Sequence, residues 1–235
     1  MQILKNLFWV NGMIHGTLGN AYAIRHENAL TLIDCGMPAD FDSVLECLNY
    51  WGLGELPIKH VLLTHGHRDH AGNAKKLQEM GAVIYVHSGD APQMLKGGLT
   101  PEMYPGPVEL AFDMPPVEAD VLLKDGDILD IEGEKIKVIG APGHTPGSVV
   151  FSWETDGKVL FFTGDTCSCA GETADEVILG WKGDPEYHAP TYLRTLNMLF
   201  KSRPDIVLGG HGFPRMCDGY KVLRNAAYNA MLEYR

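Results

Sequence analysis

The sequence predicts an α/β protein. Short runs of β-branched and aromatic residues alternate with stretches whose apolar residues recur at helical spacing. No Pro-, Gly- or Ser-rich linker divides the 235 residues, and no internal repeat or low-complexity tract is found. We therefore expect α/β layers in a single domain spanning residues 1–235.

Strands are expected where apolar runs are short and bounded by turn-forming residues. They fall at residues 21–24, 30–36, 59–65, 82–87, 135–144, 148–154, 158–165 and 205–211. Helices are expected where apolar residues recur at i, i+3 and i+4. They fall at residues 41–52, 71–81, 191–200 and 220–234. Asp40 or Asp42 is placed to cap the first helix, and Gly52 to end it.

Candidate ligands follow four of the predicted strands. The strand KHVLLTH delivers His65, KIKVIGAPGH delivers His144, KVLFFTGD delivers Asp165 and DIVLGGH delivers His211. The first strand continues into a loop that crowds His67, Asp69 and His70 together. Strand ends are rigid, and neighbouring glycines let the backbone pass close to an ion. This pattern predicts a preorganised metal site.

The residue types indicate which metal is bound. Imidazole with carboxylate suits zinc, iron or manganese, whereas thiolate-rich sets suit structural zinc or iron–sulfur clusters. We expect two divalent metal ions, with Zn²⁺ as the first choice and Fe or Mn as alternatives. The ligands divide into His65, His67 and His144 for one ion, Asp69, His70 and His211 for the other, and Asp165 as a bridge. Two cations about 3.5–4 Å apart can share a hydroxide.

The motifs THGHRDH, GAPGHTPGS, FTGDT and GGHG resemble those of the metallo-β-lactamase-fold hydrolase superfamily. That superfamily includes hydroxyacylglutathione hydrolases, lactonases, phosphodiesterases and some dioxygenases. The resemblance implies an αββα four-layer sandwich, two mixed sheets packed face to face with helices outside. It also implies that the matching residues are metal ligands. Asp34, in LIDCG, matches a position that supports the ligand loop from behind.

The expected function is a dinuclear metal-dependent hydrolase. A metal-bridging hydroxide would attack a small ester, thioester or lactone, or a phosphodiester, with Asp69 helping to orient the water. Zinc β-lactamases generally lack a counterpart of Asp165, so β-lactams are expected to be poor substrates. Many acylhomoserine lactonases carry a tyrosine where this chain has Ser168. The alternative is an iron-dependent oxygenase acting on a small sulfur compound, and a third possibility is a metal-occupied protein without activity.

Further residues are candidates for support or substrate contact. His87, in IYVHSGD, is predicted to support the site from behind. The irregular segments 89–119 and 167–188 are predicted to contact substrate. The residues chosen are Met103, Tyr104, Phe112, Trp181 and Tyr187, with Met94, Met114 and Lys182 as neighbours. The alternative for segment 89–119 is a surface excursion that packs its own apolar residues. His15, His26, His60 and His188 are expected to be structural or surface residues, and Cys167 and Cys169 to be buried thiols rather than soft ligands.

The composition limits the kinds of partner and the cellular location that we expect. The net charge of −11 argues against a broad surface for nucleic acid, so a small-molecule substrate is expected. We find no signal peptide and no apolar stretch of membrane-spanning length, so no membrane association is expected. Five cysteines without framework spacing predict reduced thiols and a cytoplasmic location. A homodimer is left open.

Overall fold

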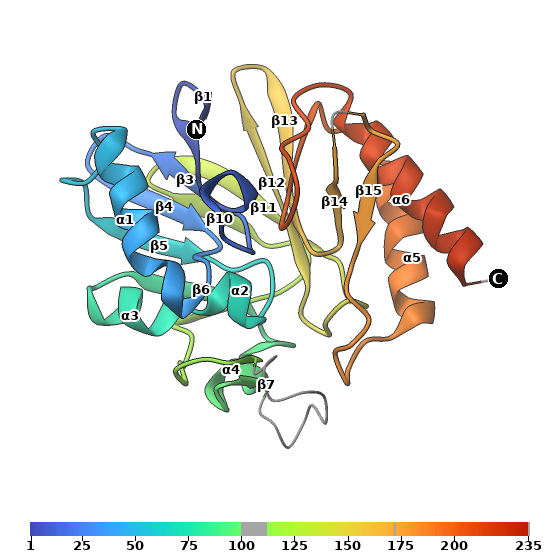
Figure 1. Cartoon of the computed structure of the whole chain (residues 1–235), viewed down its shortest axis with the longest axis horizontal. Helices are drawn as coiled ribbons and strands as arrows, with labels where there is room; N and C mark the ends of the chain where they lie inside the picture. Colours follow the sequence, from blue (N-terminus) through green and yellow to red (C-terminus); the bar gives the residue numbers. More distant parts are fainter. Residues whose placement is uncertain (100–111, 172, 235) are drawn as a thin grey trace. The chain divides into compact units, whose positions relative to one another are not determined.

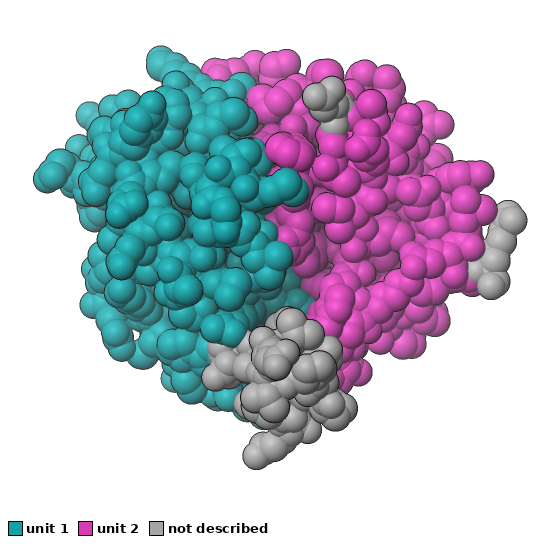
Figure 2. Space-filling view, in the orientation of Figure 1, with its two compact units in different colours: residues 1–123 teal, residues 124–235 magenta. Residues whose placement is uncertain are grey.

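The computed structural model describes residues 1–99, 112–171 and 173–234. The chain forms two compact units, residues 1–123 (unit 1) and 124–235 (unit 2), coloured separately in Figure 2. Each unit contains its own large mixed sheet and its own helices (Figure 1). The predicted α/β class with two mixed sheets is therefore confirmed. The single domain expected from the sequence stays a prediction, and each unit is described by itself.

The sheet of unit 1 has seven strands in the order β1-β2-β3-β4-β5-β6-β9. The pairs from β1 to β4 are antiparallel, and those from β4 to β9 are parallel. Parallel neighbours need crossover connections, which the helices supply. The strands are β1 (Gln2–Leu4), β2 (Leu7–Asn11), β3 (Ala21–Arg25), β4 (Leu30–Ile33), β5 (Ile58–Leu62), β6 (Val83–His87) and β9 (Val121–Leu123). The helices are η1 (Met13–His15), η2 (Pro38–Asp40), α1 (Phe41–Tyr50), α2 (Arg68–Ala71), α3 (Ala74–Glu79) and α4 (Ala91–Leu95).

Helix α1 forms where the periodicity predicts a helix, and it buries its apolar face in the core of unit 1. Val44 and Leu48 are buried there with strand residues such as Val61. Asp40, one of the two predicted caps, does not cap this helix. Asp40 precedes the helix without a side-chain capping bond, because its Oδ2 accepts the Met37 N–H at 3.1 Å instead. Asp40 therefore fixes the turn before the helix.

The predicted helix over residues 71–81 is divided into α2 and α3, and it starts earlier than expected. The physical reason is visible at His70. Its carbonyl accepts the backbone N–H of Cys35 at 2.7 Å, so the chain bends there instead of continuing a helical ladder. Asp69 and His70 therefore both lie in the short helix α2, just before the chain changes direction.

Segment 89–119 contains more structure than the sequence indicates. It holds α4 and a two-stranded ladder of β7 (Gly98–Leu99) with β8 (Phe112–Asp113). Met94 and Met114 are buried in the core cluster of unit 1. For these two residues neither prediction is correct, because they pack in the core of unit 1 and form neither an open wall nor a self-packed surface excursion.

The sheet of unit 2 has five strands in the order β10-β11-β12-β13-β16, and β14 pairs separately with β15. All neighbours in the five-stranded sheet are antiparallel except β13 and β16, which run parallel. Helices α5 and α6 lie against each other in Figure 1 and share a core cluster with strand residues. Within the described part of the chain, no helix is both long and apolar enough to cross a membrane. The elements are β10 (Ile128–Ile131), β11 (Glu134–Gly140), β12 (Val149–Thr155), β13 (Lys158–Gly164), β14 (Cys167–Cys169), β15 (Val177–Leu179), α5 (Ala189–Leu199), β16 (Ile206–Gly209) and α6 (Gly219–Glu233).

The topology of each sheet gathers the candidate residues at one edge. In unit 1, the parallel strands β4, β5 and β6 end side by side, and the next residues include Asp34, the loop after β5, and Asp90. In unit 2, β13 and β16 end together before Asp165 and His211. The turn from β11 to β12, which contains His144, lies at the same edge because Gly140 pairs with Val149. Carboxyl ends of parallel strands are where α/β sheets commonly place ligands.

Candidate metal centre

Four predicted ligands lie in the loop after β5 and in the short helix α2 that continues it. We call them the unit 1 ligand group: His65, His67, Asp69 and His70. His65 Nε2 lies 3.1 Å from His67 Nδ1, with the two rings nearly perpendicular. His70 Nε2 lies 3.5 Å from Asp69 Oδ2. The loop therefore presents two pairs of donor atoms, each pair converging on one point.

Asp34 holds this loop from behind. One carboxylate oxygen accepts the Thr64 N–H at 2.7 Å, and the other accepts the Thr64 hydroxyl and His70 Nδ1–H at 2.8 Å each. The backbone of Asp34 is left-handed (φ 57°), a conformation that Asp tolerates better than most residues. With the proton of His70 on Nδ1, the lone pair of Nε2 is directed toward Asp69. These are the contacts that the role expected of Asp34 requires.

Asp90 was missed at the sequence level. It is fully buried, and its Oδ2 accepts the N–H of Gly66, between the first two ligands, at 2.8 Å. Asp90 precedes α4 and resembles a helix cap in sequence, yet its carboxylate makes no capping bond. His87, the predicted support residue, lies at the end of β6, where Nδ1 accepts the N–H of Gly89 at 3.1 Å. Asp90 therefore contacts the ligand loop directly, whereas the hydrogen bond of His87 stays within the turn after β6.

The unit 2 ligand group consists of His144, Asp165 and His211. Asp165 Oδ2 lies 3.1 Å from His211 Nε2 and 3.6 Å from His144 Nε2. A single carboxylate oxygen thus faces the ligating nitrogens of two histidines. These separations suit ligands of one ion, or of two ions that share Asp165.

The histidines of unit 2 are held by neighbouring backbone and a hydroxyl. His144 Nδ1–H donates to the carbonyl of Trp181 at 3.0 Å, which leaves the lone pair on Nε2 facing Asp165. The backbone N–H of His211 donates to Ser168 Oγ at 3.1 Å. Ser168, at the position where lactonases carry tyrosine, therefore supports the loop after β16.

The donor set fits divalent zinc. Two ligands at about 2.0–2.1 Å from a tetrahedral ion lie about 3.3 Å apart. The four donor pairs measured within the units are separated by 3.1, 3.5, 3.1 and 3.6 Å. Imidazole and carboxylate are also ligands of iron and manganese, so the chemistry of the donors admits these metals as well.

The residues predicted to contact substrate differ in their location and exposure. Met103 and Tyr104 lie outside the described residues, and Phe112 lies in β8. Trp181 is 37% exposed. Tyr187 stacks near Tyr192, with ring centroids 5.6 Å apart, and its hydroxyl pairs with that of Tyr234. Burial raises the pKa of Tyr187, so it is a neutral hydroxyl at physiological pH.

A cavity of about 570 Å³ in unit 2 lies between the loop after β15 and α6. Trp181 and Lys182 line it, but Lys182 forms an ion pair with Glu233 and its ammonium lies over the ring of Tyr234. The cation of Lys182 is therefore engaged within the unit.

The remaining histidines have partners that are not predicted ligands. They are His15 with the Trp9 carbonyl, His26 with Thr31, His60 with Tyr85 and His188 with Thr191. Cys167 and Cys169 are both buried, and desolvation raises the pKa of Cys167 to about 12. A thiol with so high a pKa is a poor nucleophile at neutral pH.

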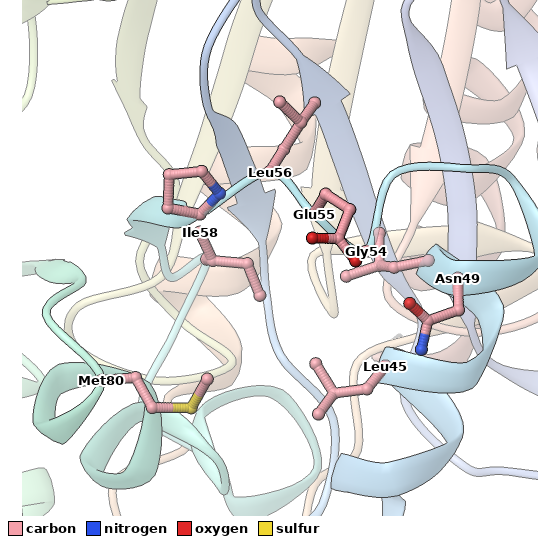
Figure 3. A pocket seen from close by; sticks show the side chains of 9 residues that line it. Leu45, Asn49, Gly54, Glu55, Leu56, Ile58 and Met80 are labelled. Carbon is pink, nitrogen blue, oxygen red and sulfur yellow. The ribbon is translucent and has the colours of Figure 1, made fainter.

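A separate cavity of about 350 Å³ lies in unit 1 between α1, the loop before β5, and the end of α3 (Figure 3). Leu45, Ile58 and Met80 point into it, with Asn49 and Glu55 at the side. None of the predicted ligands lines it. One carboxylate without an adjacent histidine does not form a hydrolytic site, so the chemistry is assigned to the ligand groups.

Comparison with known proteins identifies the class. The model of the metallo-β-lactamase superfamily matches residues 16–211, so the chain belongs to this superfamily. Among relatives, a probable metallo-hydrolase, YflN of Bacillus subtilis, is 27% identical, over 86% of this chain and 84% of that protein. The hydroxyacylglutathione hydrolase GloC of Haemophilus influenzae is 30% identical, over 67% of this chain and 70% of that protein. The predicted enzyme class, a metal-dependent hydrolase, is confirmed at this level.

The fold also matches a solved structure. The subclass B3 metallo-β-lactamase BJP-1 of Bradyrhizobium japonicum has a TM-score of 0.78, covering 100% of this chain and 91% of that protein. Its sequence identity of 21% establishes the shared fold and not a shared activity. The fold class that the motifs imply is confirmed.

Proposed function

We propose that the chain is a hydrolase that uses two divalent metal ions, with zinc as the resident metal. One ion would be bound by His65, His67 and His144. The other would be bound by Asp69, His70 and His211, and Asp165 would be a ligand of both. The observation that carries this proposal is the position of Asp165 Oδ2, 3.1 and 3.6 Å from two imidazole nitrogens of its own unit. A carboxylate oxygen between two such nitrogens suits a bridging ligand.

Two divalent cations supply an activated water near neutral pH and polarise the oxygen of a substrate carbonyl. Within the chain, Asp69 accepts a hydrogen bond from the attacking water and orients it. Asp165 offsets the repulsion between the two cations with its negative charge. Asp34 and the Trp181 carbonyl keep protons on Nδ1 of His70 and His144, so that each Nε2 is a ligand.

We infer that the substrate is a small ester, thioester or lactone. With a net charge of −11 the protein has little means of neutralising the phosphates of a nucleic acid strand. The relative from Haemophilus influenzae is named for a hydroxyacylglutathione, which is a thioester. Trp181 holds His144 through its backbone carbonyl and is partly exposed. Its indole ring offers an apolar contact for an acyl group.

The test combines metal analysis with a substrate panel. Protein purified without chelators is analysed for zinc, manganese and iron, and then assayed on esters, thioesters, lactones and phosphodiesters matched in size. We expect two zinc or manganese ions per chain and turnover of at least one acyl class. One iron per chain with oxygen consumption on a thiol substrate would instead support the oxygenase. Efficient cleavage of RNA without acyl turnover would contradict the inferred substrate class.

A further inference from the structure

Tyr192, in the first turn of α5, is fully buried, and its hydroxyl makes two short hydrogen bonds. It donates to the carbonyl of Thr166 at 2.6 Å and accepts the N–H of Gly180 at 2.7 Å. Thr166 directly follows Asp165, and Gly180 directly precedes Trp181. One hydroxyl therefore connects two backbone segments. The first follows the predicted ligand Asp165, and the second precedes Trp181, whose carbonyl holds His144.

The segment at Gly180 lies against two predicted ligands. A Cβ added to Gly180 would lie 2.6 Å from the carbonyl oxygen of Asp165 and 3.0 Å from His144 Nδ1. The next residue, Trp181, accepts the Nδ1–H of His144 at 3.0 Å. A shift of a few tenths of an ångström at Gly180 would therefore lengthen the hydrogen bond that fixes the ring of His144.

The same helix holds the loop on the other side of His144. Gly143 (φ 132°) passes so close to α5 that an added Cβ would lie 2.4 Å from the backbone of Tyr192. The hydroxyl of Thr195 donates to the carbonyl of Pro142 at 2.6 Å. The loop before His144 is thus fixed by packing and by Thr195, whereas the segment that orients its ring depends on the Tyr192 hydroxyl.

We propose that Tyr192 is a positioning residue of the metal centre, whose hydroxyl sets the spacing at which His144 and Asp165 face the same ion. The inference rests on the proposed function and assigns a role that no motif indicates. The hydroxyl acts through the Thr166 and Gly180 backbone and does not touch the metal or the substrate. Burial keeps the pKa of Tyr192 well above its usual value, so the hydroxyl stays neutral and serves as donor and acceptor together.

The first experiment compares Tyr192→Phe with wild type and with Tyr85→Phe. The control removes a tyrosine hydroxyl of unit 1 that contacts His60, which is not a predicted ligand. Zinc affinity is measured by competition with a chromophoric chelator, and unfolding of the metal-free proteins by urea. We expect Tyr192→Phe to bind one of its two ions about tenfold more weakly, as for other groups that orient a ligand. Tyr85→Phe should bind both ions as wild type does. Unchanged affinity of Tyr192→Phe for both ions would overturn the inference.

The second experiment needs no metal. Long-range ¹H–¹⁵N spectra of the metal-free proteins report which nitrogen of His144 carries the proton. We expect the Nδ1–H tautomer in wild type and Tyr85→Phe, and a mixture of tautomers in Tyr192→Phe. A wild-type pattern in Tyr192→Phe would contradict the role of the hydroxyl. Absence of zinc binding by wild type would refute the proposed function alone, since the tautomer still tests Tyr192.

A gentler variant covers the case in which Tyr192→Phe does not fold. Incorporation of 4-aminophenylalanine at position 192 keeps the shape of the ring and a donor toward Thr166, while weakening the acceptor for Gly180. We expect a smaller but measurable loss of affinity for one ion. Wild-type affinity and a wild-type His144 tautomer in this variant would also overturn the inference.

Discussion

Replacing Asp34 separates the stability of unit 1 from its capacity to bind metal. In Asp34→Ala, the buried N–H of Thr64 and the Nδ1–H of His70 lose their acceptor. A buried donor left without a partner costs about 1–3 kcal/mol, so the two together cost about 2–6 kcal/mol. The left-handed backbone at this position (φ 57°) adds roughly 1 kcal/mol for alanine. Against a typical total of about 5–15 kcal/mol, this is a large share of the free energy of unfolding.

Asp34→Asn has a different expected outcome. Asn tolerates the left-handed backbone, and its carbonyl oxygen can still accept the fixed N–H of Thr64. Its NH₂ group then faces His70 Nδ1, which must become an acceptor. The proton of His70 moves to Nε2, the atom that is 3.5 Å from Asp69 Oδ2. We expect a loss of only about 1 kcal/mol of stability, with affinity for one ion lowered about 10–100-fold.

The assay is urea unfolding of both variants in chelator, followed by zinc competition. We expect Asp34→Ala to lose more stability, and Asp34→Asn to stay well folded but to bind one ion about 10–100-fold more weakly. Equal destabilisation by the two substitutions would show that the hydrogen bonds to Thr64 and His70 are not the main contribution. Wild-type zinc affinity in a folded Asp34→Asn protein would refute the tautomer argument.

Three further predictions test the ligand assignment and the thiols. His67→Ala should lose mainly one ion and His211→Ala mainly the other, so two ions at wild-type affinity in either variant would contradict the division of ligands. Asp165→Asn keeps the shape of the side chain but removes its negative charge. It should lower turnover by several orders of magnitude in a protein that still melts cooperatively. Near-normal turnover would argue against a bridged centre. A chromogenic disulfide reagent should react rapidly with the exposed Cys217 alone and slowly with Cys47, whose pKa is raised by burial, and Cys217→Ser should abolish the fast phase.

The sequence predicts the strands that carry ligands because the last residues of each strand are buried and largely apolar. The runs before His65, Asp165 and His211 fall on β5, β13 and β16. Helix boundaries within the site are less predictable. The stretch 71–81 has good helical periodicity, but a contact with Cys35, distant in sequence, takes up the carbonyl of His70 and divides the helix. A tertiary contact of this kind leaves no local signal.

The same limit applies to the groups that orient the ligands. Histidines and carboxylates in dense motifs identify themselves by residue type and spacing. Asp90 looks like an ordinary helix cap, Trp181 acts through its backbone carbonyl, and Tyr192 lies in an unremarkable amphipathic helix. The first could have been suspected from its carboxylate shortly after the predicted strand that ends at His87. The other two act through atoms that no sequence pattern distinguishes.

The orienting groups differ between the ligands, and this difference has a chemical consequence. His70 donates to the carboxylate of Asp34, whereas His144 donates to the neutral carbonyl of Trp181. A carboxylate partner makes an imidazole a stronger electron donor than a carbonyl partner does. If His70 and His144 serve different ions, as we propose, the ion held by His70 is bound more tightly. The ion held by His144 would then receive less electron density from this histidine and would be the stronger Lewis acid, which would suit it to polarise the substrate carbonyl.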